Sequence, residues 1–281
     1  MKNFDYFEDL PQTVSFALHE DVKQGDLTAS LIPEANQASA TILCRDEAIL
    51  CGRPWFDEVF AQVDHSVQVH WLKEEGSKVQ PNEVLCEIHG SARSILTAER
   101  TALNFLQSLM ATATATSAYV SQLNDSATKL LDTRKTLPGL RLAQKYAVAC
   151  GGGQNHRIGL YDAILIKENH IMAAGSIAAA VEQAKTLYPE VTVEVETENM
   201  DEVQQALQAS ADIIMLDNFT LDMMNQAVAL VNKQAKLEVS GNVEIQHLKQ
   251  LAETGVDFIS TGAITKHLRA VDLSMRFSMD K

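Results

Sequence analysis

From residue 128 onward, one unit recurs along the chain: a short apolar run ends in polar or glycine-bearing residues, and a helix-like segment follows. Strict alternation of strands and helices predicts a parallel sheet, either doubly wound or closed into a barrel. The apolar runs are nearly continuous, as expected for parallel strands that are buried on both faces. The helix-like segments also have ordinary ends, because Ser176 can cap one and Gly255 can terminate another. The six strand candidates are TKLLDTRK, DAILIKEN, VTVEVETEN, ADIIMLDNF, KLEVSGN and VDFISTGAIT.

The first part of the chain, up to about residue 93, follows a different pattern. The runs ATILCRDEAIL, SVQVHWL and NEVLCEIHG alternate between apolar and polar residues, as half-buried antiparallel strands do. Turn residues separate these runs. This pattern predicts a separate α+β domain, joined to the repeating part by a long helix over about residues 95–123.

Charge is distributed unevenly along the chain. The 281 residues carry a formal charge of −14, which argues against general binding to nucleic acids or membrane surfaces. The window 132–170 is the exception, with six Lys/Arg residues against three acids. No secretory signal and no apolar run long enough to span a membrane is visible, so we expect a cytoplasmic protein. The four cysteines form no C-x-x-C motif, and we expect them to be reduced thiols.

Polar side chains stand at the end of every predicted strand. In an α/β barrel the active site lies at the carboxyl ends of the strands, so groups from different strands meet there. These strand ends carry Asp132, Thr133, Arg134 and Lys135; Lys167, Glu168, Asn169 and His170; Glu196 and Thr197; Asp217 and Asn218; Ser240, Gly241 and Asn242; and Ser260, Thr261, Gly262 and Ala263.

These groups divide by chemistry. The glycines on the last two strands free backbone N–H groups, which suits a phosphate. Glu196 and Asp217 could hold Mg²⁺ or ribose hydroxyls. Five cations form a wall for a multiply charged anion. This combination predicts a site for a phosphorylated sugar and an anionic acceptor, and spacing alone goes no further. The five cations are Arg134, Lys135, His156, Arg157 and Lys167.

Each of these groups also has a simpler explanation. The pair Arg134–Lys135 could be exposed on a loop, Glu196 and Asp217 could cap helices, and the glycine groups could be turns. Cys150 and Met215 are more typical of core residues than of reactive ones. The coincidence of all the polar groups at equivalent positions of one repeating unit favours the functional interpretation.

One long motif is specific to a known family. DTRKTLPGLRLAQKYAV together with GGGQNHRIGLYDAILIKENH, over residues 132–170, closely resembles quinolinate phosphoribosyltransferase, the carboxylating nicotinate-nucleotide pyrophosphorylase of NAD biosynthesis. The resemblance covers essentially the whole chain in the same order. The further matching segments are EDVKQGDLT, ERTALNFLQ, VEVE, IMLDN, EVSGN and ISTGA.

The resemblance implies a fold and an assembly. It implies an α+β domain at residues 1–110 and an incomplete parallel α/β barrel at 111–266, with the tail 267–281 returning to the N-terminal domain. The family barrel has seven strands, one more than the six counted here. We also expect a homodimer, with Arg100 of ERTALN reaching the site of the neighbouring subunit.

The resemblance also implies an activity. A pentosyltransferase of this family joins quinolinate to 5-phosphoribosyl 1-pyrophosphate with Mg²⁺ and no organic cofactor, giving nicotinate mononucleotide, pyrophosphate and CO₂. Lys135 would face the pyrophosphate, and Glu196 and Asp217 would hold the ribose hydroxyls and Mg²⁺; with Lys167 they form the catalytic set. Thr133 belongs to the substrate-binding set. The quinolinate carboxylates would be held by Arg134, His156, Arg157 and Lys167, and the 5-phosphate by Ser240, Gly241, Asn242, Thr261, Gly262 and Ala263.

Two other functions remain open. A nicotinate phosphoribosyltransferase would use related chemistry without decarboxylation, although the density of cations favours a dicarboxylate. A non-catalytic barrel that senses phosphosugars would bind both ligands without releasing pyrophosphate.

Overall fold

A computed structural model describes residues 4–123, 125–241 and 243–279. The chain divides into two compact units that alternate along the sequence. The first unit comprises Met1–Ser117, Leu137–Gly152 and His267–Lys281, and the second comprises Ala118–Thr136 and Gly153–Lys266. The sequence predicts domains at residues 1–110 and 111–266, and these boundaries stay a prediction.

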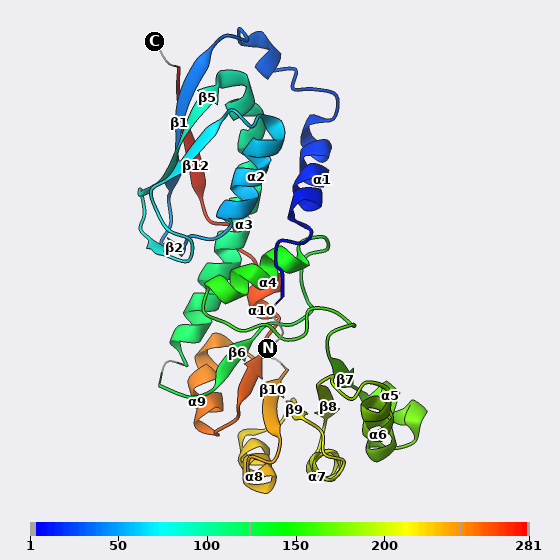
Figure 1. Ribbon diagram of the computed structural model, residues 1–281. Helices are drawn as coiled ribbons and strands as arrows, with labels where there is room; N and C mark the ends of the chain where they lie inside the picture. The colour runs from blue at the N-terminus through cyan, green and yellow to red at the C-terminus, as the bar shows by residue number, and fades with distance from the viewer. Residues whose placement is uncertain (1–3, 124, 242, 280–281) are drawn as a thin grey trace. The chain divides into compact units, whose positions relative to one another are not determined.

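The first unit is built on an antiparallel sheet with the strand order β12-β1-β5-β3 (Figure 1). The C-terminal strand β12 pairs along the whole of β1, from Ala38 opposite Met279 to Cys44 opposite Leu273. The last strand of the chain therefore completes a sheet whose other members come from the first 91 residues. The strands are β1 (Gln37–Cys44), β3 (Gln68–Trp71), β5 (Val84–Ser91) and β12 (Leu273–Met279), beside a small pair, β2 (Ala48–Ile49) and β4 (Lys78–Val79).

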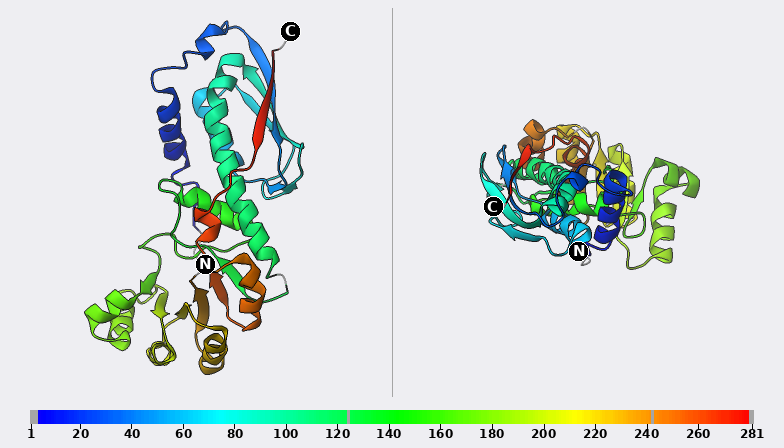
Figure 2. Two further views of the ribbon diagram at one scale, coloured as in Figure 1. Left: turned by 180° about the vertical axis from the view of Figure 1, so that it is seen from behind. Right: turned by 90° about the horizontal axis from the view of Figure 1, so that it is seen from above.

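Helices cover one face of this sheet, and the long helix α3 runs along it (Figure 2). The core of the unit combines Ile42 of β1, Phe56 of α2 and Leu106 of α3, all fully or almost fully buried. A helix over about 95–123 was predicted, and α3 confirms it. The helices are α1 (Leu10–Val22), α2 (Arg53–Val63), α3 (Ala92–Ser121) and α4 (Arg141–Cys150), with a short 3₁₀ turn at Ala29–Leu31.

The second unit is built on a six-stranded, barrel-like parallel sheet with the order β6-β11-β10-β9-β8-β7 (Figure 1). All six strands coincide with the predicted runs, which confirms the α/β class. A single parallel bridge between Leu131 and Gln154 continues the sheet beside β6. The strands are β6 (Lys129–Leu131), β7 (Ile164–Ile166), β8 (Val193–Thr197), β9 (Ile213–Asp217), β10 (Lys236–Ser240) and β11 (Phe258–Ser260).

The strands of this sheet have two different faces. Val195, Leu216 and Val239 are buried on the face that the helices cover, and α6, α7 and α9 contact β8, β9 and β11. Ser176 caps α6 by accepting a hydrogen bond from the Ala179 N–H, as predicted. The connecting helices are α5 (Glu168–Ala174), α6 (Ile177–Leu187), α7 (Met200–Gln208), α8 (Leu221–Val231), α9 (Leu248–Glu253) and α10 (Ala263–Lys266), with a 3₁₀ turn at Ile245–His247.

The opposite face of the strands carries polar side chains, which the sequence patterns did not predict for strands buried on both faces. Glu194 of β8 and Glu238 of β10 are almost completely buried there. Among the residues that the structure describes, no helix is both long enough and apolar enough to cross a membrane.

Candidate active site

The register of the parallel sheet places several predicted site residues on its polar face. In parallel strands, paired residues point to the same side, and side chains alternate between faces along each strand. Glu196 is paired with Met215, two residues before Asp217, and Asp217 is paired with Ser240. Glu196, Asp217 and Ser240 therefore project from one face at the carboxyl ends of three neighbouring strands.

Lys167, directly after β7, forms an ion pair with Glu196 of the neighbouring strand β8. Ile166, the last residue of β7, is paired with Val195 of β8. The residues that follow them, Lys167 and Glu196, are therefore neighbours as well. The Glu196 side chain is 13% exposed and that of Lys167 is 42% exposed. Lys167, which is predicted to bind a carboxylate of quinolinate, and Glu196, which is predicted to bind the ribose, are thus direct neighbours.

Glu196 also lines a pocket of about 360 Å³ next to α5, α6 and α7. Three other carboxylates line the same pocket, those of Glu168, Glu198 and Glu202. A wall of carboxylates suits a cation or hydroxyl groups and disfavours a phosphate, because like charges would meet.

The turn after β10 packs closely against the end of β9. Gly241 has φ +127°, and a Cβ at this position would lie 2.6 Å from Oδ1 of Asn218. The Asn218 side chain also donates a hydrogen bond to Asp217 Oδ2 at 2.8 Å. Glycine is therefore required here both by its backbone conformation and by the close approach of Asn218. The predicted phosphate ligand Asn242 lies outside the described residues.

The ends of β6 and β11 meet in the same way, because the two strands are neighbours. A Cβ on Gly262 would lie 2.8 Å from Cδ of Lys135 and 3.2 Å from Oγ1 of Thr133. The Ala263 N–H donates to Thr261 Oγ1 at 3.1 Å, which forms a compact turn. The structure thus brings Thr133 and Lys135 against the predicted phosphate turn at residues 261–263.

Arg134 and Arg157 lie near each other, since the charge of Arg134 contributes to lowering the pKa of Arg157, after burial as the larger cause. Both side chains are partly buried. The Arg157 guanidinium donates to the Ala163 carbonyl at 3.3 Å. Asp162 stabilises the loop that follows Arg157, because its carboxylate accepts hydrogen bonds from the backbone N–H groups of Ile158 and Gly159, each at 2.8 Å. Two partly buried guanidinium groups whose charges interact suit an anion.

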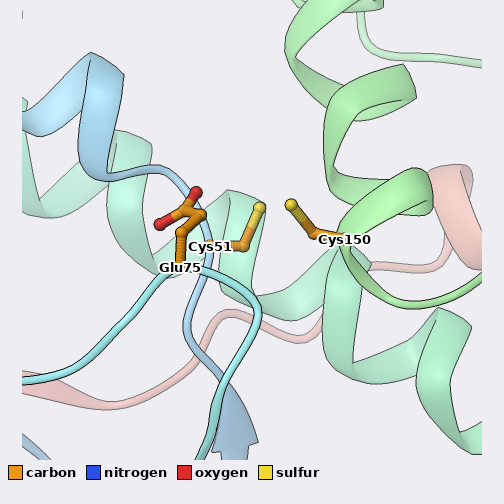
Figure 3. A group of neighbouring side chains, drawn as sticks. All are labelled: Cys51, Glu75 and Cys150. Atoms are coloured by element: carbon orange, nitrogen blue, oxygen red, sulfur yellow. The ribbon is translucent and has the colours of Figure 1, made fainter.

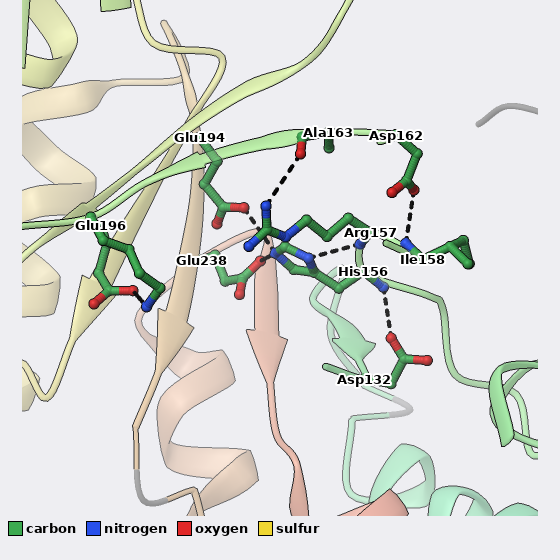
Figure 4. Close-up of polar contacts among 10 residues, drawn as sticks. Asp132, His156, Arg157, Ile158, Asp162, Ala163, Glu194, Glu196 and Glu238 are labelled. Atoms are coloured by element: carbon green, nitrogen blue, oxygen red, sulfur yellow. Dashed lines mark hydrogen bonds and ion pairs between the residues drawn. The ribbon is translucent and has the colours of Figure 1, made fainter. Parts of the chain in front are cut away.

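The ring of His156 has protein partners on both nitrogens (Figure 4). Its Nδ1 accepts the Arg157 N–H at 2.8 Å, which leaves the proton on Nε2, 2.8 Å from Glu194 Oε2. Glu238 Oε2 is 3.5 Å from the same Nε2. His156 therefore lies among the predicted site residues, but its ring is oriented by buried carboxylates.

Glu194 and Glu238 are site residues that the strand-end pattern did not identify. Burial, and after it the negative charge of Glu194, raise the pKa of Glu238 to about 8, against the opposing effect of His156. Glu238 is thus protonated at neutral pH, which lets two buried carboxyl groups lie beside one histidine. The available signal was an acidic residue inside an apolar strand, in VEVET and KLEVS.

Asp132 has a structural role that its place at a strand end did not reveal. It is fully buried, and its two oxygens accept hydrogen bonds at 2.8 Å from the Asn155 side chain and the His156 N–H. Asp132 thereby fixes the segment that carries His156 to the end of β6.

Arg100 is the one predicted site residue that belongs to the first unit, where it is exposed on α3. Its reach into a neighbouring subunit stays a prediction. Within the described parts of the chain, Glu196 and Asp217 do not belong to a group of three metal-type ligands within 4.8 Å of one another. Two carboxylates without a third ligand are still compatible with Mg²⁺, which usually binds one or two carboxylates together with substrate phosphates.

Comparisons with known proteins cover nearly the whole chain. Residues 26–110 match the model of the quinolinate phosphoribosyl transferase N-terminal domain, and residues 112–276 match that of the C-terminal domain. A probable carboxylating nicotinate-nucleotide pyrophosphorylase of Bacillus subtilis is 40% identical over 257 residues, which are 91% of this chain and 89% of the relative. The solved nicotinate-nucleotide pyrophosphorylase of Francisella tularensis is 50% identical, with a TM-score of 0.94 and 98% of both chains covered. A Streptococcus pyogenes structure, titled NadC, is 37% identical, with a TM-score of 0.94 and complete coverage of both chains.

Proposed function

The chain belongs to the quinolinate phosphoribosyltransferase family, and we infer that it transfers the phosphoribosyl group of 5-phosphoribosyl 1-pyrophosphate to quinolinate. The transfer is accompanied by decarboxylation and gives nicotinate mononucleotide, pyrophosphate and CO₂, a step of NAD biosynthesis. It uses no organic cofactor.

The observation that carries this proposal is the gathering of complementary charges in the second unit. Arg134 and Arg157 are partly buried and their charges interact, and Lys167, directly after β7, pairs with Glu196. These cations match the two carboxylates of quinolinate. The N–H groups of Gly241 and Gly262, in the turns at residues 240–241 and 261–263, would bind the 5-phosphate, and Lys135 packs against the second turn.

The carboxylates on the polar face of the sheet suit the sugar. Glu196 and Asp217 would bind the ribose hydroxyls, near the ring carbon on which positive charge grows as pyrophosphate leaves. The oxygen-rich donor set around Glu196 also fits Mg²⁺, which would be held by Glu196 and Asp217. When bound, Mg²⁺ neutralises the negative charge of the pyrophosphate.

The role of this chain's residues in the reaction is to bring two anionic substrates together. Lys135 stabilises the charge that develops on the pyrophosphate oxygens. Arg134 and Arg157 hold the ring of quinolinate so that its nitrogen faces the ribose carbon. The new bond makes the ring nitrogen cationic, and the adjacent carboxylate then leaves as CO₂ because the electron pair left on the ring carbon is stabilised beside that cation. This carbon then takes up a proton from water.

The assembly and location follow as proposals from the family. Arg100 of a second subunit would complete the quinolinate site in a homodimer, and the enzyme would act in the cytoplasm. A variant with Arg100→Ala would then keep its fold and lose affinity for quinolinate.

The activity is tested with quinolinate labelled in its 2-carboxylate, 5-phosphoribosyl 1-pyrophosphate and Mg²⁺. We expect labelled CO₂, nicotinate mononucleotide and pyrophosphate in equal amounts. Nicotinate in place of quinolinate should give no nucleotide. Turnover of nicotinate would instead indicate a phosphoribosyltransferase without decarboxylation, and binding of both substrates without pyrophosphate release would indicate a sensor.

A further inference from the structure

A group of reactive side chains lies in the first unit, apart from the site residues described in the second (Figure 3). Cys51 comes just before α2, and Cys150 is the last residue of α4. Their sulfur atoms point toward each other, and with a carboxylate oxygen of Glu75 they all lie within 4.8 Å of one another. Both cysteines are free thiols.

The group is held in place by backbone and side-chain contacts. Glu75 accepts the N–H groups of Gly52 at 2.7 Å and Arg53 at 3.3 Å, which fixes its carboxylate beside Cys51. The hydroxyl of Tyr146, one turn before Cys150 on α4, acts on both Glu75 and Cys150 and lowers the pKa of each against the effect of burial. The two thiols are thus positioned by two different segments.

The two thiols differ in access and in acidity. Cys51 is fully buried, whereas Cys150 is partly exposed. A hydrogen bond from Cys51 lowers the pKa of Cys150, and one from Tyr146 lowers it further against the effect of burial. Burial is the main cause that raises the pKa of Cys51, and its interaction with Cys150 adds to this rise. An accessible thiol of lowered pKa next to a protonated partner is the arrangement found in redox-active dithiols.

We propose that Cys51 and Cys150 form an oxidisable dithiol, which a hydroperoxide converts to a disulfide. The Cys150 thiolate attacks one peroxide oxygen, the O–O bond breaks, and Cys150 becomes a sulfenic acid. The second peroxide oxygen leaves as hydroxide and takes up the proton that Cys150 released, which gives the first water. The Cys51 sulfur then attacks the Cys150 sulfur, the S–O bond breaks, and water leaves with the proton of the Cys51 thiol. In total, two thiols and one hydrogen peroxide give one disulfide and two waters. A carboxylate oxygen of Glu75 lies within 4.8 Å of the Cys51 sulfur, where it can take up the Cys51 proton and pass it to the leaving water.

The disulfide would join the segment before α2 to the end of α4. A bond between positions so distant in sequence restricts the unfolded chain strongly, so the oxidised protein should unfold at a higher temperature than the reduced protein. A dithiol reductant restores the two thiols.

The test uses the full chain treated with a small molar excess of hydrogen peroxide. Remaining thiols are then alkylated, and peptides are mapped by mass spectrometry without reduction. We expect a peptide pair that joins Cys51 to Cys150, two hydrogen atoms lighter than the separate peptides and lost after dithiothreitol. In the variant Cys51→Ser, Cys150 should instead be trapped as a sulfenic acid by dimedone.

The other two cysteines provide the matched control. Cys44 and Cys86 lie on β1 and β5, fully buried, so Cys44→Ser should leave the Cys51–Cys150 bond unchanged. Full alkylation of both Cys51 and Cys150 after peroxide would overturn the proposal, as would a dimedone adduct on Cys150 in the unsubstituted protein without a cross-link. If Zn²⁺ alone binds with one-to-one stoichiometry and peroxide forms no disulfide in the metal-free protein, the group is a metal site and the proposal is wrong. The peptide map of the unsubstituted protein decides the question even if a variant fails to fold.

Discussion

His156 is the residue whose structural setting differs most from its expected role. The sequence marks it as one of five cations facing the substrate, yet its ring nitrogens contact the Arg157 N–H and the Glu194 carboxylate. A ring committed to these partners orients the loop that carries Arg157. Most of the charge that balances quinolinate must then come from the guanidinium groups and Lys167.

We therefore expect Arg134→Ala to impair catalysis strongly. The variant loses a pair of charge-assisted hydrogen bonds to a carboxylate, a loss of about 3 kcal/mol that lowers kcat/KM for quinolinate by about a hundredfold. Steady-state kinetics with both substrates measures this effect.

A cation outside the site provides the control for this variant. Lys185 forms hydrogen bonds with the Ser210 carbonyl and Asp212, and Lys185→Ala should leave kcat/KM within a factor of about two. A wild-type kcat/KM for Arg134→Ala would show that Arg134 does not bind quinolinate.

The buried carboxyl group of Glu238 predicts a pH-dependent stability. Its pKa is raised to about 8 in the folded protein, from 4.5, because of burial and the nearby Glu194. Below pH 4.5 the group is protonated in both states, and its contribution is fully present. As the pH rises from 4.5 to about 8, the unfolded protein has released the Glu238 proton while the folded protein still holds it. The free energy of unfolding therefore falls over this range, and the contribution is lost once the pH has passed through 8.

Glu238→Gln removes this titration. We expect the variant to gain stability relative to the unsubstituted protein between pH 5 and pH 9, by on the order of 3 kcal/mol. Urea denaturation at several pH values measures the difference. Glu253→Gln, at an exposed position at the end of α9, is the control and should run parallel to the unsubstituted protein. Parallel curves for Glu238→Gln as well would mean that Glu238 ionises normally.

At the scale of the elements, the sequence predicted the strands of the second unit well and their faces poorly. Hydrophobic runs bounded by glycine or polar residues locate the strands and indicate where each one ends. They do not reveal the register between strands, which decides that Glu194 and Glu238 meet over His156. Long-range pairing of this kind depends on contacts between segments that are distant along the chain.

The candidate site was predictable to the same extent. Strand-end residues such as Lys167, Glu196 and Asp217 were identified, because the fold class alone fixes where strand ends meet. Asp132 was placed at the correct strand end, but its function in holding residues 155–156 depends on a loop conformation. Roles carried by buried hydrogen bonds leave little trace in a sequence pattern.

The close contact between the end of α4 and α3 predicts that adding one methyl group at Gly151 will destabilise the fold. A Cβ on Gly151 would lie 2.4 Å from the Ala113 carbonyl oxygen and 2.6 Å from Cβ of Thr116, both on α3. Backbone atoms of a helix cannot move aside, so Gly151→Ala should lower the free energy of unfolding by about 2 to 4 kcal/mol. Chemical denaturation measures this loss.

Gly139→Ala is the matched control for that variant. Gly139 has φ +77° and nothing within 4 Å of its Cβ position, so its substitution carries only the backbone strain, about 1 kcal/mol. If both variants lose the same stability, the α4–α3 contact is less tight than the structure indicates.

For the whole molecule, the C-terminal strand is the element whose removal should matter most. A chain that ends at Asp272 lacks β12, and β1 becomes an edge strand from Ala38 to Cys44, paired only with β5. The exposed edge would promote aggregation, and we expect little soluble folded protein. A chain that ends at Met279 retains β12 and is the control. An unchanged melting temperature for the shorter chain would contradict this role of β12.

The pairing of β12 with β1 also limits how far the first unit can fold during protein synthesis. Strand β1 (Gln37–Cys44) is translated well before its partner β12 (Leu273–Met279). The chain crosses between its two units after residues 117, 136, 152 and 266, so no nascent fragment contains a complete first unit. A growing polypeptide must therefore carry an unpaired edge on β1 until β12 has been made, and a chaperone that shields such edges would act on this protein during translation.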